Sequence, residues 1–302
     1  MNGQGTDDFL DRDFELDAYE RLSAGGICPP LLAKFTNGIV MQLIEGVVFT
    51  GDSVKAKSNA RLTAREIARM HKNVGLRDSE REASLVDSVK HFLSLVKEHT
   101  IEHIDGDYKL VKTTDSTKII QFFEEDFAYA QSLIAKQSSP LVVCHNDLLL
   151  ANFLHDTKND KVTIIDYEYL APNPAAFDLA NHFNEYAGTE VVSFSVLELF
   201  LSFQFDFDNI PGEEYQKWWL TEYLPEFLEE TTIPQTTVDQ WMKSIKLMAP
   251  LSHLLWGTWA LMQLEKSAID FDYANYAMDR LKCYFQLKKD LETSSSDTDH
   301  AR

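Results

Sequence analysis

Cysteine is scarce in this 302-residue sequence, and long uninterrupted hydrophobic runs are absent from it. The three cysteines, Cys28, Cys144 and Cys283, form no C-x-x-C pair, which excludes a disulfide framework and a thiolate zinc site. The two longest apolar stretches, Val191–Phe203 and Met248–Leu264, are short or interrupted by polar residues. We therefore expect buried helices there and no insertion into a membrane.

Positive charge is also in short supply. The chain has 28 Lys and Arg against 48 Asp and Glu, a net charge of −20 at pH 7. A strongly acidic surface repels the phosphates of nucleic acids and of anionic lipids, so we expect neither as a partner. Residues 1–17 are acidic and lack the apolar segment of a signal peptide, which predicts a cytoplasmic location.

The N-terminal part is predicted to hold one helix and one hairpin. Apolar residues spaced along Asp11–Ala24 indicate an amphipathic helix, which the two following glycines end. Two short apolar runs, Leu31–Phe35 and Ile39–Ile44, flank Asn37-Gly38, which is a strong hairpin signal. We assign residues 1–46 to this small unit and its linker.

The rest of the chain is predicted to be a helical body around a short β region. Residues 62–135 have mostly helical patterns, a region of short strands and turns begins at Leu141, and helical patterns return after Phe177. With 44% hydrophobic residues the chain has ample material for a core. We expect residues 47–291 to form one large lobe and the polar tail, 292–302, to be disordered.

The β region holds a group of polar residues with the potential for chemistry. His145-Asn146-Asp147 follows a buried strand directly. If the apolar runs on either side of the turn near Lys158 pair as a hairpin, Asn152 lies opposite Ile165 and therefore beside Asp166. An amide oxygen next to a carboxylate is a donor set that suits Mg²⁺.

This layout is typical of phosphoryl transfer. Asp147 would accept the proton of an attacking hydroxyl, while Asn152 and Asp166 would hold the metal ion. Each of these residues alone is as well explained as a turn residue. Their order, spacing and strand context together favour the catalytic interpretation.

Three longer strings extend this pattern. They are CHNDLLLANFL from Cys144, TIIDYEYLAPNPAAFDLANHFNEYAG from Thr163 and HLLWGTWALMQLEKSAIDFDYANYAMDRLKCYF from His253. With them the chain resembles the choline/ethanolamine kinase family, from about residue 6 to about residue 290. Leu149 and Tyr186 resemble the ethanolamine kinase branch, because the choline branch typically has Gln and Trp at those positions.

The resemblance implies an α+β, protein-kinase-like bilobal fold with a truncated N-terminal lobe and a mostly helical C-terminal lobe. It implies ATP and Mg²⁺ as cofactors, Asp147 as the catalytic base, and Asn152 and Asp166 as metal ligands. Gln42 and Ile44 match the linker whose backbone binds adenine. Glu15 resembles the helix glutamate that orients phosphate-binding cations in kinases, whereas Glu168 is a family marker without an assigned role.

The resemblance also implies a pocket for a small amino alcohol. An ammonium group is attracted to aromatic faces by roughly 0.5–2 kcal/mol per contact and to carboxylates. The expected substrate-binding residues are Tyr169, Glu185, Trp256, Trp259, Tyr273 and Tyr276. Without the resemblance, aromatic residues at helical spacing are more often core, and for Trp256 and Trp259 that alternative stays open. We expect His145 to brace the catalytic loop and His182 to be a buried structural residue.

The N-terminus departs from the family pattern. Family members carry an N-terminal hairpin with a phosphate-covering loop and a strand with a basic residue, and Met1 aligns just after that strand. Glu15 is therefore expected to lack a basic partner in this chain. A fragment of an active kinase, a shortened form and an inactive family member all fit this start.

The sequence therefore favours an ATP-dependent ethanolamine kinase that leads to phosphatidylethanolamine. Alternatives are a kinase of dual specificity for choline and ethanolamine, and an inactive binding or regulatory module. A phosphotransferase for another amino alcohol or an antibiotic is a third, which the string NHFNEYAG disfavours. The partner expected is a small amino alcohol, and a homodimer stays open.

Overall fold

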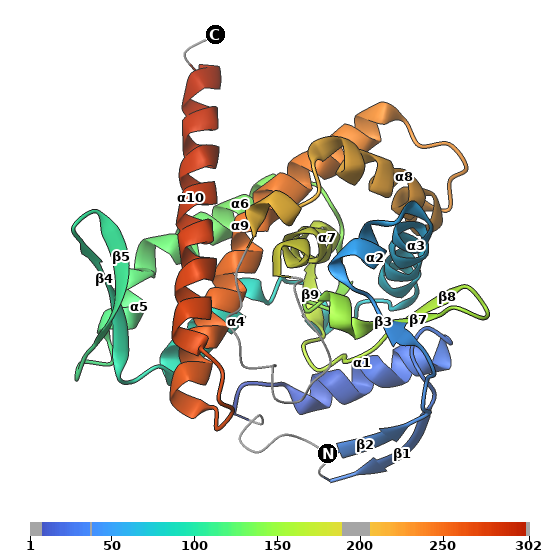
Figure 1. Ribbon diagram of the computed structural model, residues 1–302, viewed down its shortest axis with the longest axis horizontal. Helices are drawn as coiled ribbons and strands as arrows, with labels where there is room; N and C mark the ends of the chain where they lie inside the picture. Colours follow the sequence, from blue (N-terminus) through green and yellow to red (C-terminus); the bar gives the residue numbers. More distant parts are fainter. Residues whose placement is uncertain (1–7, 37, 189–205, 300–302) are drawn as a thin grey trace. The chain divides into compact units, whose positions relative to one another are not determined.

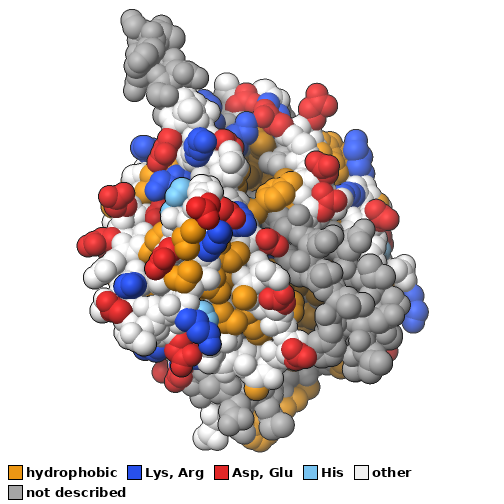
Figure 2. Space-filling view, turned by 60° about the vertical axis from the view of Figure 1, so that its left-hand side comes forward, with side chains coloured by type: hydrophobic (Ala, Val, Ile, Leu, Met, Phe, Trp, Pro, Cys, Tyr) orange, Lys and Arg blue, Asp and Glu red, His pale blue; other side chains and the backbone are white. Residues whose placement is uncertain are grey.

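The computed structural model describes residues 8–36, 38–188 and 206–299 (Figure 1). No helix within these ranges is both long enough and apolar enough to cross a bilayer. Figure 2 shows Asp and Glu side chains scattered over the face drawn, with Lys and Arg among them. All three cysteines are free, as the sequence predicts, and all three are buried.

The chain divides into two compact units. Among the described residues, the first unit comprises 8–83, 138–188 and 206–243, and the second comprises 84–137 and 244–299. The first unit contains both the N-terminal helix and the loop that carries Asp147, so these units do not test the expected segments. The expected division after residue 46 therefore stays a prediction.

The first unit begins with the expected helix and hairpin. Helix α1 (Arg12–Ala24) is capped by the side chain of Asp11, which accepts a hydrogen bond from the N–H of Phe14 at 3.0 Å. Strands β1 (Leu31–Phe35) and β2 (Gly38–Met41) pair antiparallel. Both strands are confirmed, although the second ends at Met41 and not at Ile44.

The β region of this unit consists of two small sheets. Strands β6 (Leu141–Cys144) and β9 (Ala171–Pro174) pair antiparallel. A second sheet has the order β3-β7-β8, from Val47–Val48, Phe153–Asp156 and Lys161–Ile164. The hairpin β7–β8 has Phe153 opposite Ile164, so the predicted register is confirmed.

Helices make up most of the remainder of the first unit. Helix α3 (Lys57–Asn73) packs on α8 (Glu213–Leu228) and on strand β8, and every residue of α7 (Ala175–Asn184) is buried. This buried helix packs on β6 and β9 and so supports the loop that carries Asp147, the predicted catalytic loop. The remaining elements of this unit are α2 (Gly51–Lys55), α3 (Lys57–Asn73), η2 (Asp78–Glu80), η3 (Leu150–Asn152), α7 (Ala175–Asn184), η4 (Glu185–Gly188), η5 (Phe207–Asn209) and α8 (Glu213–Leu228).

The second unit is mainly helical and contains one hairpin that the sequence interpretation missed. Strands β4 (His99–Ile104) and β5 (Asp107–Lys112) pair antiparallel around Asp105 and Gly106, which both have positive φ. An Asp-Gly pair favours such a tight turn, so the helical prediction across this segment was wrong. Its helices are α4 (Leu85–Leu95), α5 (Lys118–Phe122), α6 (Glu124–Lys136) and α10 (Tyr273–Asp299). Helix α9 (Gln235–Lys266) begins in the first unit and ends in the second.

Helix α10 corrects the expected disordered tail. It continues through Asp299, so residues 292–299 are helical. Once a helix has formed, each residue added to its end gains one backbone hydrogen bond, and polar residues form this bond as well as apolar ones. The hydroxyl of Ser294 donates to the carbonyl of Asp290 at 2.8 Å. The stretch Met248–Leu264 lies in α9 as expected, whereas all of Val191–Phe203 lies outside the described residues.

Candidate active site

The catalytic loop leaves β6 through a backbone conformation that is unusual for a residue other than glycine. Asn146 has φ 66°, and its side chain donates to the carbonyl of Tyr169 at 2.7 Å. The side chain of Asn173 donates to the Asn146 side-chain oxygen at 2.8 Å. These bonds from β9 and the segment before it hold the left-handed turn immediately before Asp147.

His145 braces this loop, as expected. Its Nε2–H donates to the carbonyl of Ile165 at 3.0 Å, and its Nδ1 accepts from the N–H of Asp147 at 3.3 Å. One donor and one acceptor nitrogen define a neutral imidazole. Burial lowers the pKa of His145, which also favours the neutral form.

Asp147 is buried among other carboxylates. Its side chain is 8% exposed, and the amide of Asn152 donates both to its carboxylate at 3.1 Å and to its carbonyl at 2.8 Å. Burial raises the pKa of Asp147 well above its ordinary value, and the carboxylates of Glu185, Asp166 and Glu168 add to this rise. A carboxylate in such surroundings accepts a proton more readily than one in water.

Asn152 and Asp166 meet at the end of the hairpin β7–β8. The N–H of Ile165 donates to the carbonyl of Asn152 at 2.9 Å, which extends the strand register by one pair. Asp166 follows with φ 65° and an exposed side chain. The Asn152 nitrogen is bound to Asp147, which leaves its amide oxygen for a ligand. An amide oxygen beside several carboxylates fits a hard divalent cation such as Mg²⁺.

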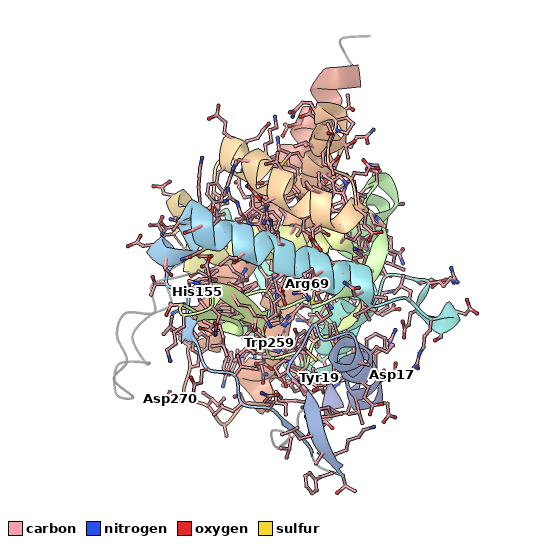
Figure 3. The ribbon with its side chains drawn as sticks, turned by 90° about the vertical axis from the view of Figure 1, so that its right-hand side faces the viewer. Asp17, Tyr19, Arg69, His155, Trp259 and Asp270 are labelled. Atoms are coloured by element: carbon pink, nitrogen blue, oxygen red, sulfur yellow. The ribbon has the colours of Figure 1, made fainter. Side chains whose placement is uncertain are left out.

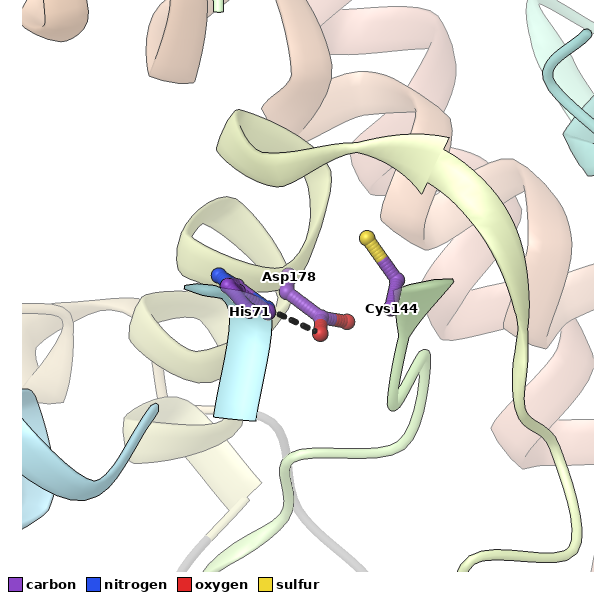
Figure 4. Close-up of side chains that lie close together, drawn as sticks. All are labelled: His71, Cys144 and Asp178. Carbon is purple, nitrogen blue, oxygen red and sulfur yellow. Dashed lines mark hydrogen bonds and ion pairs between the residues drawn. The ribbon is translucent and has the colours of Figure 1, made fainter. Parts of the chain in front are cut away.

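A second buried network lies beneath the loop, formed by His71, Asp178 and Tyr223. The carboxylate of Asp178 accepts the backbone N–H groups of His145 and Asn146, both at 2.7 Å. It also contacts Nε2 of His71 at 2.9 Å (Figure 4), and Nδ1 of His71 contacts the hydroxyl of Tyr223 at 2.8 Å. The sequence strings contain Asp178, but nothing in the pattern linked it to a histidine on α3.

The side chains of His71, Cys144 and Asp178 lie close enough to hold a metal ion, yet their bonds indicate a brace. Both carboxylate oxygens already accept backbone hydrogen bonds. Burial raises the pKa of the Cys144 thiol well above its ordinary value, and the thiol donates to the carbonyl of Asn173 at 3.3 Å. A protonated thiol and a satisfied carboxylate are poor metal ligands. Cys144 is therefore a buried residue of strand β6.

His182, on α7, supports the loop from its other side. It is fully buried, as expected, and its Nδ1 lies 3.1 Å from the carbonyl of Leu148, the residue after Asp147. That nitrogen must therefore carry the proton it donates to the carbonyl. Burial lowers the pKa of His182 to about 4.

This pKa predicts an acid-sensitive contribution to stability. The free energy of unfolding that His182 contributes is complete above pH 6.5 and is lost as the pH falls from 6.5 to about 4, because only the unfolded chain binds the proton. The loss amounts to about 3 kcal/mol. Urea unfolding at pH 7 and pH 4.5 should show a smaller decrease for His182→Asn than for the unsubstituted protein. The matched control His103→Asn, at an exposed histidine, should retain the full decrease, and equal decreases in all three would contradict the prediction.

Glu15 requires a correction, because it does have a basic partner. The guanidinium of Arg12, three residues earlier on α1, lies 2.6 Å from the Glu15 carboxylate. The same Nη1 atom lies 3.5 Å from the carboxylate of Glu168. The sequence interpretation looked for a cation on a separate strand and overlooked the i, i+3 position on the same helix face.

The two expected adenine-binding residues lie in the segment after β2. Gln42 is exposed and Ile44 is half-buried. The N–H of Gln42 donates to the carbonyl of Pro30 at 2.9 Å. The backbone N–H of Gln42 is therefore occupied, and its carbonyl is the backbone group left to bind a nucleotide base.

The expected amine-binding residues lie in both units. Tyr169 and Glu185 belong to the first unit, where Glu185 is buried near Asp147. In the second unit the rings of Trp256 and Trp259 meet edge to face, with centroids 5.4 Å apart, and Trp259 (labelled in Figure 3) meets Tyr273 at 5.8 Å.

An additional aromatic residue joins this cluster. The ring of Phe271 contacts Tyr273 at 4.9 Å and Tyr276 at 5.8 Å, and it is 38% exposed. The string FDYANY, in which Phe271 stands close to both tyrosines, is the sequence signal that could have indicated this residue. Arg280 lies over the ring of Tyr276, 5.1 Å from its centroid, so a cation already occupies one aromatic face. That these aromatic residues bind substrate stays a prediction.

Comparison with known proteins finds relatives along most of the chain. The family model described as choline/ethanolamine kinase matches residues 1–285. Mouse ethanolamine kinase 2 is 31% identical over 286 residues, which cover 95% of this chain and 68% of that protein. Human ethanolamine kinase 1 is 30% identical, over 96% of this chain and 61% of its own length.

Solved structures agree in fold. An ethanolamine kinase of Plasmodium vivax superposes with a TM-score of 0.76 and 25% identity, over 93% of this chain and 73% of that one. A choline kinase of Cryptosporidium parvum gives 0.74 and 25%, over 95% and 80%. The fold is therefore protein-kinase-like, α+β and mostly helical. The chain belongs to the choline/ethanolamine kinase family.

Proposed function

We propose that this protein is an ethanolamine kinase, which transfers the γ-phosphoryl group of ATP to the hydroxyl of ethanolamine. Family membership supports a kinase of amino alcohols, and the relatives described above include ethanolamine kinases. The observation that carries the proposal is the convergence of Asp147, Asn152 and Asp166 at the end of β6 and of the β7–β8 hairpin. The product would enter phosphatidylethanolamine synthesis.

In this mechanism Asp147 orients the substrate hydroxyl and accepts its proton as the oxygen attacks the phosphoryl group. Two hydrogen bonds hold Asp147 in position. The amide of Asn152 donates to the Asp147 carboxylate, and the backbone N–H of Asp147 donates to Nδ1 of His145. A fixed base needs little reorganisation in the transition state, so positioning supplies a large part of the rate acceleration.

Asn152 and Asp166 would hold Mg²⁺, and their oxygen atoms fit that ion. A bound Mg²⁺ would neutralise charge on the transferred phosphoryl group. The carbonyl of Gln42 and the N–H of Ile44 are proposed to bind adenine.

Glu185 is proposed to bind the ammonium group. The buried carboxylate of Glu185 raises the pKa of Asp147. Glu185 therefore carries a negative charge near the substrate hydroxyl that Asp147 is proposed to deprotonate. Ethanolammonium carries N–H donors that Glu185 can accept, whereas choline carries none and depends more on aromatic contact. The preference for ethanolamine rests on this difference and on Leu149 and Tyr186.

A direct test compares the two amino alcohols. With Mg²⁺ and ATP, we expect phosphoethanolamine to form with a kcat/KM at least about tenfold above that for choline, a difference of about 1.4 kcal/mol in transition-state stabilisation. Product formation can be followed by ³¹P NMR. Equal turnover of choline would contradict the branch assignment. An absence of nucleotide binding in an ATP titration would instead favour the inactive binding module.

A further inference from the structure

Helix α10 passes directly against α9 at Gly257, the residue that follows Trp256. A Cβ atom on Gly257 would lie 2.8 Å from Cγ and 2.9 Å from Cδ2 of Leu281, and 3.3 Å from Cβ of Arg280. Non-bonded carbon atoms pack at about 3.5–4.0 Å, so any side chain at position 257 would have to push α10 away. Leu281 and Arg280 are both fully buried, which leaves their side chains no free space to move into.

The glycine is not required by the backbone of α9. Gly257 lies in the interior of this helix and does not have a positive φ. Glycine in a helix interior is less favourable than alanine, because it loses more conformational freedom on folding. The close approach of α10 is therefore the structural reason for glycine at this position.

The aromatic cluster proposed to bind the amino alcohol draws its rings from the same two helices. Trp256 and Trp259 come from α9, and the ring of Trp259 meets that of Tyr273, the first residue of α10, with centroids 5.8 Å apart. Nε of Arg280 donates to the hydroxyl of Tyr276 at 3.1 Å, and its guanidinium lies over that ring. A shift of α10 at the glycine would therefore move both tyrosines relative to the tryptophans.

We propose that Gly257 is a positioning residue that sets the distance between α9 and α10, and with it the width of the amine-binding aromatic cluster. The inference rests on the proposed function for the identity of the ligand. A cation gains from an aromatic face only within about 6 Å of the ring centroid, so a wider cluster binds an ammonium group less tightly. Asp147 belongs to the first unit and keeps its own hydrogen bonds.

The proposal predicts a change in substrate binding with little change in the chemical step. For Gly257→Ala we expect the KM for ethanolamine to rise about tenfold, while kcat and the KM for ATP change less than about threefold. The near-UV circular dichroism spectrum should change as well, because it depends on the packing of the aromatic rings. That spectrum is measured without substrate.

The rescue variant removes the atoms that a methyl group at position 257 would meet. Leu281→Ala deletes both Cγ and Cδ2, and the remaining neighbour, Cβ of Arg280, has to shift by only a few tenths of an ångström. Gly257→Ala combined with Leu281→Ala should therefore show the spectrum and the KM for ethanolamine of Leu281→Ala alone. If Gly257→Ala by itself does not fold, recovery of folding and of this KM in the double variant supports the proposal.

Three results would overturn the proposal. One is a double variant that does not fold, and another is a double variant that keeps the tenfold rise in KM. The third is a Gly257→Ala protein whose KM for ethanolamine and near-UV spectrum are both unchanged.

Gly75→Ala is the matched control. Gly75 follows α3 in the first unit, has no positive φ, and has no atom beyond its chain neighbours within 4 Å of the added Cβ. Its KM and spectrum should be unchanged, and an equal rise in KM would refute the role given to the contact with α10. If the unsubstituted protein fails to phosphorylate ethanolamine, the proposed function fails by itself, while the spectra still decide whether Gly257 spaces the two helices.

Discussion

Replacing Asp147 by asparagine is expected to lower kcat by about 10²–10⁴-fold, the contribution typical of a positioned general base. Asparagine has the same shape but cannot take the hydroxyl proton. Because Asp147 is a buried carboxylate close to three others, removing its charge should leave the protein at least as stable. Turnover of ethanolamine and the urea unfolding midpoint test both expectations together.

The control for this prediction is Asp160→Asn. Asp160 lies in the turn of the β7–β8 hairpin with φ 51° and an exposed side chain, and asparagine tolerates the same left-handed backbone. This variant removes a carboxylate from the same hairpin without touching the catalytic loop, so its turnover should be unchanged. Near-normal turnover of Asp147→Asn would refute the role given to Asp147.

Replacing Asp178 by alanine is expected to lower the free energy of unfolding by about 3–5 kcal/mol, because it removes the acceptor from several buried donors. The N–H groups of His145 and Asn146 would lose their partner, and His71 would lose its contact at 2.9 Å. The left-handed turn at Asn146 would then be less favourable. Turnover should fall even where the protein remains folded.

Asp178→Asn serves as the second variant if the alanine form does not fold. One amide oxygen still accepts a backbone hydrogen bond, so the loss of stability should be smaller, while the nitrogen opposes the second N–H. We expect kcat to fall with little change in the KM for ethanolamine, because the network touches the catalytic loop. A wild-type unfolding midpoint and wild-type kcat in both variants would contradict the proposed brace.

The sequence predicted the β7–β8 hairpin and its register correctly because both are determined locally. Two apolar runs and a polar turn determine the hairpin register, and the register places Asn152 opposite Ile165 and beside Asp166. The strand before His145 likewise predicts that Asp147 follows on a loop. Few other arrangements satisfy both the alternation of side chains and the turn chemistry.

Other features required the folded chain. The bond between His71 and Asp178 joins residues 107 positions apart, and no local pattern encodes it. The contact of Arg12 with Glu168 was overlooked because these residues approach each other only when their two segments fold together. The hairpin at residues 99–112 was missed because alternation over a short segment competes with a helical pattern in its neighbours.

By itself, the sequence determined the family, the order of the helices and strands around the catalytic loop, and the oxygen-rich character of the site. The family was suggested by the resemblance of three sequence strings, whereas the elements and the oxygen-rich site follow from side-chain periodicity, turn residues and the spacing of motif residues. Only the tertiary structure decided which distant side chains surround and brace the loop that carries Asp147. Hydrogen bonds and ion pairs between distant segments depend on distances of a few ångströms, and those distances exist only after the chain has packed.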